Sequence, residues 1–400
     1  MAADPALSAP AITALRDRGP AGLDALWQAH AQAILQHEAN SSTSASPEDQ
    51  NAWQRLKTAL DKVSGQRDCR ASHLYWYTDL EQAKAAASAS GKPILSLRLL
   101  GKLDEEYSCA NSRFFRTTLY ANTEIATYLR QHFVLHWKSV RPVPRITVDF
   151  GDGRKIEQTI TGNSIHYILA PNGEVIDALP GLYGPKAFKQ GLADAEKAVL
   201  QCNALAVGKR ADFLMNYHRE QLQTLAGNWS KDLAQLQRDQ ATAANASSSL
   251  QVQPALFQIK AATQPDAVPS DSPIWNRIAT LHLGEAELDA GAQKLIASKT
   301  PTAYDASRVA FTKSVAENPF LAMMRNLQRS LAEDTVRNEY HLHFTIHEWF
   351  VKGVVPANLD QLNAKVYAQL FLTPDSDPWL GMAPANTFTG LDNNGLIKTP

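Results

Sequence analysis

The stretch that most constrains the fold is residues 92–133, where an apolar run, a cysteine and a helical segment follow one another. The run "PILSLRLL" at 93–100 predicts a buried strand. A charged loop leads to Cys109, and the residues behind it predict a helix that extends to about residue 131. A cysteine at a helix N-terminus tends to have a lowered thiol pKa, because the backbone amides there favour the negatively charged thiolate. This stretch therefore predicts a thiol held at the start of a helix.

Composition narrows the classes of protein. The 400 residues are enough for two or three domains, and 44% of them are apolar. A net charge of −1 gives no signature of polyanion binding, so we expect no nucleic-acid partner. No apolar run reaches the roughly 18 residues of a membrane helix, so we expect no membrane span. The start "MAADPALSAP" is no signal peptide, but "AADPA" resembles the remainder after cleavage. We therefore expect a periplasmic or secreted protein, with a cytoplasmic one as the alternative.

The three cysteines are Cys69, Cys109 and Cys202. An odd count in a chain of this length is not typical of a disulfide scaffold. A bond between Cys69 and Cys109 is one alternative, and it would make Cys109 structural. We expect the two thiols to stay free, since nothing in the sequence requires them to approach each other.

Residues 1–70 predict a helical extension and residues 71–201 an α/β domain. The extension contains expected helices at 11–38, broken near Gly19-Pro20, and at 51–63, with a linker at 40–50. In the α/β domain, five β-prone segments alternate with helical ones, and we expect one mixed sheet from residues 74–78, 93–100, 133–139, 164–170 and 174–179. Asp79 caps one helix, Gly91 ends it, and Pro185 opens the closing helix. Residues 141–162 predict a hairpin, because "DFGDGRK" at 149–155 is typical of a tight glycine turn rather than a calcium loop.

The order of these elements, β-α-β-α-β-hairpin-β-β-α, resembles the thioredoxin fold over residues 72–200. It is similar to the branch in which a cysteine motif precedes a helix with phenylalanines, here Phe114 and Phe115, and then "ANTEIATYL" and "HFVLHW". The resemblance implies that Cys109 is the attacking cysteine and that Ser112 stands at the resolving position. A C-x-x-S motif can attack a disulfide but cannot release its own mixed disulfide intramolecularly. We expect Ser112 to donate a hydrogen bond to the thiol and Arg113 to contact an anion; the alternative is a Cys109 that only packs under the helix.

The family also carries a cis-proline before a central strand, opposite the cysteine. Asn163, Ser164 and Ile165 occupy that place here, so the backbone edge that would bind a polypeptide substrate is altered. His166 follows them and is expected near the thiol. A Cys109–His166 pair would be an activated nucleophile or half of a metal site. The alternative is that His166 packs on one face of its strand.

Residues 202–400 predict a mainly helical domain. We expect helices at 274–295, 303–316, 320–351 and 359–371, and linkers or loops at 238–251 and 264–273. Glu339, His343 and His347 are spaced for one broad helical face, but a metal would need a ligand from another segment. We therefore expect histidines bonded to neighbouring protein groups and no metal. In "SDPWLG" at 376–381, we expect a turn and a Trp379 that anchors the tail; partner docking is the alternative.

These observations favour a single-cysteine thiol-disulfide exchange role, with a protein or a small thiol as substrate and no cofactor. One alternative is a non-catalytic thioredoxin-like module for binding or scaffolding. The other is metal handling through Cys109 and His166.

Overall fold

The structure, a computed structural model, describes residues 5–39, 46–246, 273–300, 319–356, 358–380, 382 and 391. The chain divides into two compact units, residues 1–354 and 355–400. The first contains both sheets and all of the candidate sites.

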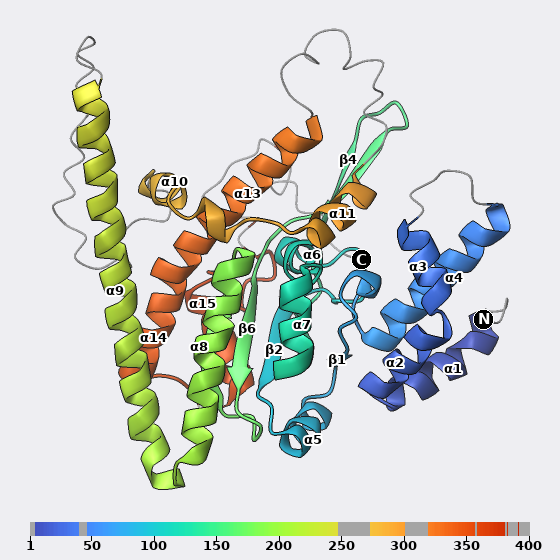
Figure 1. Ribbon diagram of the computed structural model, residues 1–400, viewed down its shortest axis with the longest axis horizontal. Helices are drawn as coiled ribbons and strands as arrows, with labels where there is room; N and C mark the ends of the chain where they lie inside the picture. The colour runs from blue at the N-terminus through green and yellow to red at the C-terminus, as the bar shows by residue number, and fades with distance from the viewer. Residues whose placement is uncertain are drawn as a thin grey trace. The chain divides into compact units, whose positions relative to one another are not determined.

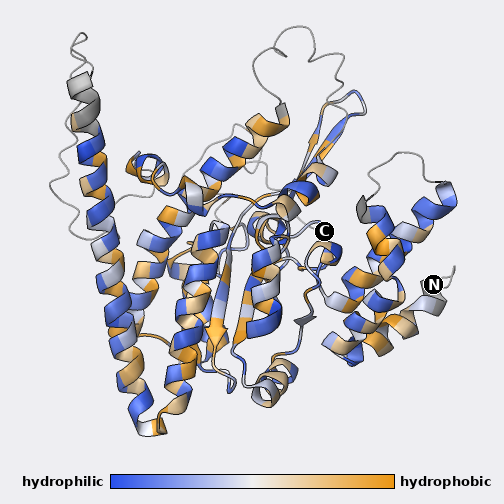
Figure 2. Ribbon diagram, in the orientation of Figure 1, coloured by the Kyte–Doolittle hydropathy of each residue, from blue (hydrophilic) through white to orange (hydrophobic). Residues whose placement is uncertain are grey.

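One five-stranded mixed sheet forms the centre of the first unit (Figure 1). Its strand order is β1-β3-β2-β6-β7, and the strands are β1 (Trp76–Tyr77), β2 (Ile94–Leu100), β3 (Val134–Arg141), β6 (Ser164–Leu169) and β7 (Val175–Pro180). β1 and β2 run parallel to β3, whereas β6 runs antiparallel to both β2 and β7. The expected single mixed sheet from these five segments is confirmed. Every residue of β2, β6 and β7 is buried, and Figure 2 shows hydrophobic colour on β6.

The register decides which side chains share a face of the sheet. His166 lies opposite Leu97 of β2 and Leu179 of β7, and Asp177 lies opposite Ile168. Directly paired residues of antiparallel strands point to the same face, and so do alternate residues of one strand. His166 and Asp177 therefore point to the same face, with His166 inside the sheet and Asp177 on the edge strand.

Helices with clear boundary residues connect the strands. They are α5 (Leu80–Ser90), α6 (Ala110–Phe114), a π-helical segment η2 (Phe115–Leu119), α7 (Thr123–His132) and α8 (Pro185–Ala204). Asp79 accepts a hydrogen bond from the amide of Gln82, and Gly91 ends α5 in the left-handed conformation, both as expected. Figure 1 shows α7 and α8 in front of β2 and β6.

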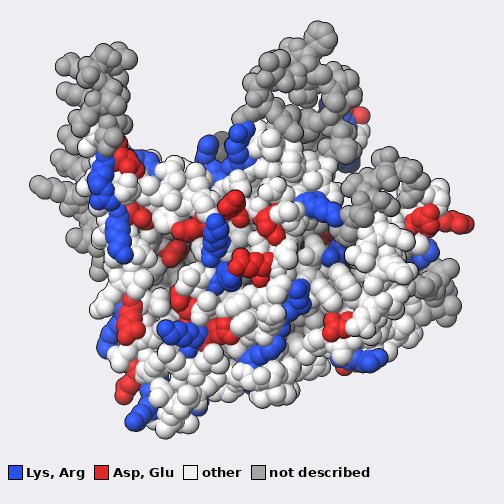
Figure 3. All heavy atoms as spheres, in the orientation of Figure 1, with Lys and Arg blue, Asp and Glu red and all other residues white. Residues whose placement is uncertain are grey.

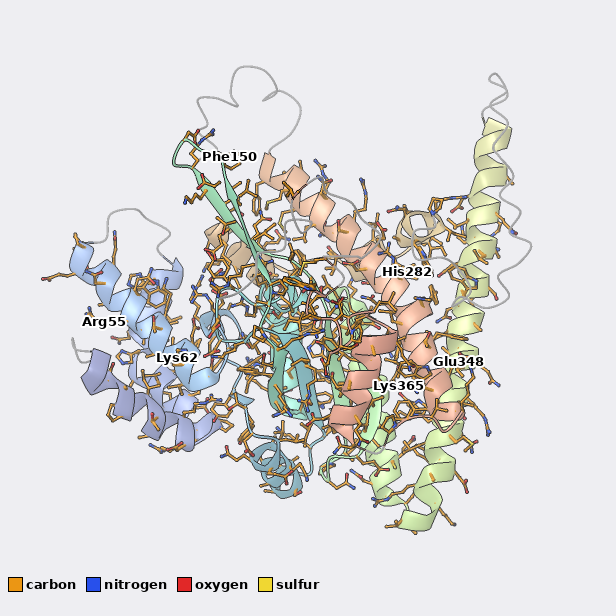
Figure 4. The ribbon with its side chains drawn as sticks, turned by 180° about the vertical axis from the view of Figure 1, so that it is seen from behind. Arg55, Lys62, Phe150, His282, Glu348 and Lys365 are labelled. Carbon is orange, nitrogen blue, oxygen red and sulfur yellow. The ribbon has the colours of Figure 1, made fainter. Side chains whose placement is uncertain are left out.

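The expected hairpin forms a separate two-stranded sheet. β4 (Arg145–Asp149) pairs with β5 (Lys155–Thr159), and the turn contains Gly151 and Gly153 with φ of 75° and 92°. Positive φ favours glycine, which accounts for the two glycines of the turn. Most of the hairpin is exposed, including Phe150 in the turn, which Figure 4 labels.

The N-terminal helices have a core of their own. They are α1 (Pro5–Asp17), α2 (Pro20–Ala29), α3 (Ala31–Ala39) and α4 (Pro47–Ser64), followed by a 3-10 turn η1 (Cys69–Ala71). The predicted helix at 11–38 is therefore three helices, and the break at Gly19-Pro20 is confirmed. Arg16 joins these helices to the sheet, since its guanidinium donates to the carbonyls of Val63 and Trp76. Of the predicted linker, residues 40–45 lie outside the described part of the chain.

The helices after α8 in the first unit differ from the prediction in their boundaries. They are α9 (Val207–Ala246), α10 (Ile274–Ala279), a 3-10 turn η4 (Leu283–Glu285), α11 (Ala290–Lys299), α13 (Pro319–Arg337), a π-helical segment η5 (Asn338–His343) and α14 (Phe344–Val351). The linker predicted from residue 238 is wrong up to Ala246, because α9 continues through that polar stretch. The helix predicted at 274–295 is interrupted by η4. The helix predicted at 303–316 and residues 264–272 of the second predicted linker lie outside the described residues.

The second unit contains α15 (Leu359–Gln369), close to the prediction. Its Asp377–Leu380 segment forms the expected turn, since the Trp379 amide donates to the Asp377 carboxylate. Trp379 itself keeps 45% of its surface exposed, and its expected anchoring of the tail stays a prediction, since most residues after 380 lie outside the described part of the chain. The neighbouring Leu380 is buried instead.

Candidate functional sites

Cys109 lies where the sequence places it, between β2 and α6, but no part of it reaches solvent. It precedes the first residue of α6 and is 0% exposed. Its amide donates to the carbonyl of Leu100 at the end of β2. The position expected for a thiol at a helix start is therefore correct. A thiol without solvent access cannot meet a soluble disulfide in this conformation.

The segment before β6 closes this end of the sheet. The amide of Ala110, the first residue of α6, donates to the carbonyl of Thr161 at 3.0 Å. The hydroxyl of Thr159 donates to the carbonyl of Ser108 at 2.9 Å. An amide of the helix start, which would otherwise be available to an anion, is thus bonded to a backbone carbonyl. These two bonds hold the loop against the residues on both sides of Cys109.

Ser112 does not have the expected role in this conformation, and the anion contact expected of Arg113 stays a prediction. The Ser112 hydroxyl donates to the carbonyl oxygen of Cys109 at 2.9 Å, so its single proton is not directed to the sulfur. Arg113 is half-buried, and its Nε has no hydrogen-bond partner among the described residues. Arg116, on the next turn, donates to the carbonyls of Glu105 and Glu106 and so holds the loop before the cysteine.

The residues in the cis-proline position are also shielded from solvent. Ser164 and His166 are 0% exposed and Asn163 is half-buried, and the described residues contain no cis peptide bond. His166 Nε2 lies 2.6 Å from the Tyr120 hydroxyl, and the ring packs on Phe115 and Phe188. Burial lowers the pKa of His166 to about 3, so the imidazole is neutral near pH 7. His166 therefore packs on a strand face, as the alternative expectation had it.

All three cysteines are free and buried, which confirms the expected absence of a Cys69–Cys109 bond. Burial raises the pKa of the Cys69 thiol to about 12. It also raises the pKa of Cys202.

A pocket of about 570 Å³ lies at the other edge of the sheet, against β7. Its walls come from β7, α8, α9, η4 and η5, and most of the lining side chains are polar. Acidic and basic side chains are interspersed on the face that Figure 3 shows. Charged residues of both signs also line the pocket: Lys186, Lys231, Asp177, Asp194, Asp232, Glu285 and Glu339.

Gly181 brings η5 against the end of β7. It has a φ of 79°, and a Cβ atom there would lie 2.4 Å from the side chain of Asn338. Without that atom, the Asn338 amide approaches closely and donates to the Leu182 carbonyl at 2.7 Å. Thr335 accepts a hydrogen bond from the Gly184 amide at 2.6 Å. The π-helical segment is therefore fixed to the chain just after β7, which positions His343 beside Asp177.

Both oxygens of the Asp177 carboxylate, which lines the pocket, accept hydrogen bonds. One oxygen accepts from the Ala178 amide at 2.7 Å and from His343 Nε2 at 3.0 Å. The other accepts from the Tyr217 hydroxyl at 2.5 Å. Burial raises the pKa of Asp177, but His347, His343 and His218 outweigh it and hold that pKa below its usual range.

Two further histidines lie behind Asp177. His218 Nδ1 and His347 Nδ1 are 2.8 Å apart, and both residues are 0% exposed. The Nε2 atom of each has no hydrogen-bond partner among the described residues. An unpaired buried polar atom costs about 1–3 kcal/mol, so this arrangement is unusual for a packed core. The expected bonding of the histidines to protein groups is confirmed, and Asp177 is the carboxylate that His343 contacts.

The pocket wall also carries a hydrogen-bonded cluster of one histidine and two carboxylates. His282 lies 2.9 Å from Asp232 and 2.8 Å from Glu285, and its position is labelled in Figure 4. Hydrogen bonds to these two carboxylates raise the pKa of His282 to about 10. The Tyr340 hydroxyl donates to the same Asp232 oxygen that His282 contacts. Burial, with the charge of Glu285 next, raises the pKa of the neighbouring Glu339 to about 7, which suits a proton donor or acceptor.

Sequence reasoning missed most of this second site. Asp177 carries a signal that could have found it, since it is the one charged side chain inside the buried strand "VIDALP". Tyr217 and His218 lie within an ordinary amphipathic helix and carry none. Among the described residues, the groups of three or more His, Cys, Asp or Glu that could hold a metal comprise only Asp177, His343 and His347. Cys109 and His166 are not in such a group.

No family model, curated protein or solved structure matches this chain. Within the described residues, no helix has both the length and the apolarity needed to cross a membrane.

Proposed function

We propose that this protein is a thioredoxin-like binding module whose ligand site lies at the β7 pocket and not at the cysteine. The strand order and directions of the five-stranded sheet support a thioredoxin-like arrangement. The single observation that carries the proposal is the contrast between the two ends of the sheet. Cys109 is 0% exposed, whereas a polar pocket of about 570 Å³ is open beside Asp177.

The pocket's chemistry indicates the class of ligand. Its volume suits a small molecule, and its walls offer two exposed lysines, Lys186 and Lys231, with several carboxylates and the amides of Gln190, Gln221 and Asn228. Such a mixture of donors and acceptors recognises a polar solute with both anionic and hydroxyl or amino groups. An apolar ligand would cover these polar groups without offering them hydrogen-bond partners.

A substitution that fills the pocket tests the proposal. Ala187 lines the pocket from α8, and Ala187→Trp would occupy part of its volume. Ala193→Trp is the matched control, because Ala193 is a half-buried alanine of the same helix outside the pocket lining. The measurement is the melting temperature with a panel of amino acids, dicarboxylates, polyols and nucleotides.

We expect at least one compound class to raise the melting temperature of the wild type and of Ala193→Trp by roughly 2 °C or more. Ala187→Trp should lose that shift. The proposal fails if no class stabilises the wild type, or if the pocket-filling variant responds as strongly as the control.

The thiol-exchange role stays a prediction of the sequence, and the burial of Cys109 does not favour it. Metal handling through Cys109 and His166 is likewise not favoured, because among the described residues neither belongs to a group of side chains that could hold a metal ion. Thiol labelling tests whether the buried Cys109 becomes accessible to solvent.

A further inference from the structure

We infer that Asp177, His343 and His347 together bind one divalent transition-metal ion, for which zinc is the reference ion. The inference goes beyond the proposed ligand pocket, because a metal can occupy these three residues whether or not an organic molecule is present. It also differs from the expectation that the histidine helix holds no metal. That expectation rested on the lack of a ligand from another segment, and β7 supplies one.

The donor set and its spacing carry the inference. One ligand atom from each of the three residues lies within 4.8 Å of the others, and all three residues are buried. A tetrahedral zinc ion with bonds of about 2.0–2.2 Å needs ligand atoms roughly 3.4 Å apart. Asp177 Oδ1 and His343 Nε2 are already 3.0 Å apart. Two imidazoles and one carboxylate are a donor set that suits zinc and ferrous iron.

The unpaired nitrogen of His347 is the second observation. If His347 Nδ1 donates its proton to His218 Nδ1, the lone pair of His347 Nε2 is free, and no described residue uses it. Metal-bound histidines usually donate their other ring proton in this manner, which fixes the tautomer and the ring. His218 is thus a positioning residue for His347. Metal binding would give this 0% exposed atom the partner that it lacks.

Tyr217 has the corresponding role for the carboxylate. Its hydroxyl donates to Asp177 Oδ2 at 2.5 Å and leaves Oδ1 directed to His343. The three metal ligands come from β7 and from the junction of η5 and α14. Tyr217 and His218, which hydrogen-bond to two of these ligands, both come from α9. Packing of three elements therefore arranges the site before any ion arrives.

The site leaves a coordination position for a further ligand. Three protein ligands are typical of zinc sites with an open fourth position, in contrast to the four of a structural site. Asp177 and His343 both line the β7 pocket, so that position faces the pocket. Water or an anionic group of a pocket ligand would complete the coordination.

The test is metal binding by the full chain, purified without a histidine tag, stripped with chelator and then titrated with zinc chloride in the absence of any organic ligand. We expect one equivalent of zinc by elemental analysis and a Kd below about 1 μM by competition with a chelating dye. His347→Gln and Asp177→Asn should each weaken binding by more than about 100-fold. His218→Gln should weaken it by about 10–100-fold, as is usual when a hydrogen-bond partner of a metal-bound histidine is removed.

His132→Gln is the matched control, because His132 is a partly exposed histidine on α7 that is bonded to Glu196 outside this site; its Kd should be that of the wild type. Cobalt chloride gives an independent reading, since cobalt held by imidazoles absorbs visible light.

The inference is overturned if the wild type retains no zinc at about 10 μM free ion. It is also overturned if folded His347→Gln binds zinc or cobalt as the wild type does. The zinc titration of the wild type can overturn the inference without any variant, so the test stands even if a variant fails to fold. Zinc binding does not test the proposed ligand pocket at β7. The melting-temperature assay tests that proposal separately.

Discussion

The Nδ1 atoms of His218 and His347 lie 2.8 Å apart in a fully buried pair that joins α9 to α14. One nitrogen must donate and the other accept, so at least the accepting ring is neutral when the bond is formed. Burial lowers the pKa of His218 to about 4 and the pKa of His347 well below its ordinary value. Because of this pair, the free energy of unfolding depends on pH below pH 7.

The first prediction concerns this acid side. An unfolded histidine has a pKa of about 6.5, so between pH 6.5 and 4 the unfolded chain binds a proton that folded His218 does not. Unfolding free energy should therefore be largest above pH 6.5 and fall towards pH 4, by up to about 3 kcal/mol for His218. His218→Gln should show a shallower fall in urea melts across this range, and His132→Gln should not. An equally steep fall in His218→Gln would contradict the prediction.

The second prediction concerns His282 and has the opposite sign. Its pKa is raised to about 10 by Asp232 and Glu285, so its protonated form stabilises the folded state fully below pH 6.5. That contribution is lost as the pH rises from 6.5 through 10. We expect His282→Asn to be less stable than the wild type by about 2 kcal/mol at pH 6 and close to it at pH 10.

Urea melts at several pH values measure this difference, with His30→Asn on the N-terminal helices as the control. A His282→Asn deficit that is the same at pH 6 and pH 10 would show that the loss is one of packing and not of charge.

The third prediction isolates one hydrogen bond to the buried carboxylate. Tyr217→Phe removes the donor to Asp177 Oδ2 and leaves the ring in place. Because hydrogen bonds to charged groups are worth about 1.5–3 kcal/mol, the unfolding free energy should fall by about 2 kcal/mol. Tyr107→Phe, at a half-exposed tyrosine beside the hairpin, should change it by less than about 0.5 kcal/mol. Denaturant melts at pH 7 decide; equal effects would rule out a special role for Tyr217.

The fourth prediction concerns Cys109. With no exposed surface, its thiol should react with iodoacetamide at neutral pH far more slowly than a free thiol with a pKa of about 8.5. After denaturation in guanidinium chloride, all three cysteines should label, since all three are free. Peptide mass analysis against time measures the rate.

Ser112→Cys extends the same test to the thioredoxin-like motif. The position is buried, so we expect no reduction of insulin by this variant. Rapid labelling of Cys109 in the folded protein, or insulin reduction by Ser112→Cys, would contradict this prediction and favour the thiol-exchange role.

The sequence was sufficient wherever a local rule decides the structure. Asp79 and Gly91 bound α5 because a side-chain oxygen can satisfy a helix amide and glycine tolerates positive φ. Gly151 and Gly153 specify the hairpin for the same conformational reason. The five β-prone segments pair in one sheet because each is apolar enough to be buried. Local rules failed at residues 238–246, where a polar sequence typical of a linker continues α9.

Tertiary structure alone decided the sites. Whether Cys109 reaches solvent depends on Thr161, whose carbonyl accepts the Ala110 amide across a hairpin that separates the two segments. Asp177 and His343 are 166 residues apart in the chain yet 3.0 Å apart in space. Their meeting depends on the missing Cβ of Gly181, which admits Asn338. A sequence specifies such contacts only through the packing of all elements at once, because the free energy of a buried contact belongs to both partners and to the surroundings that exclude water.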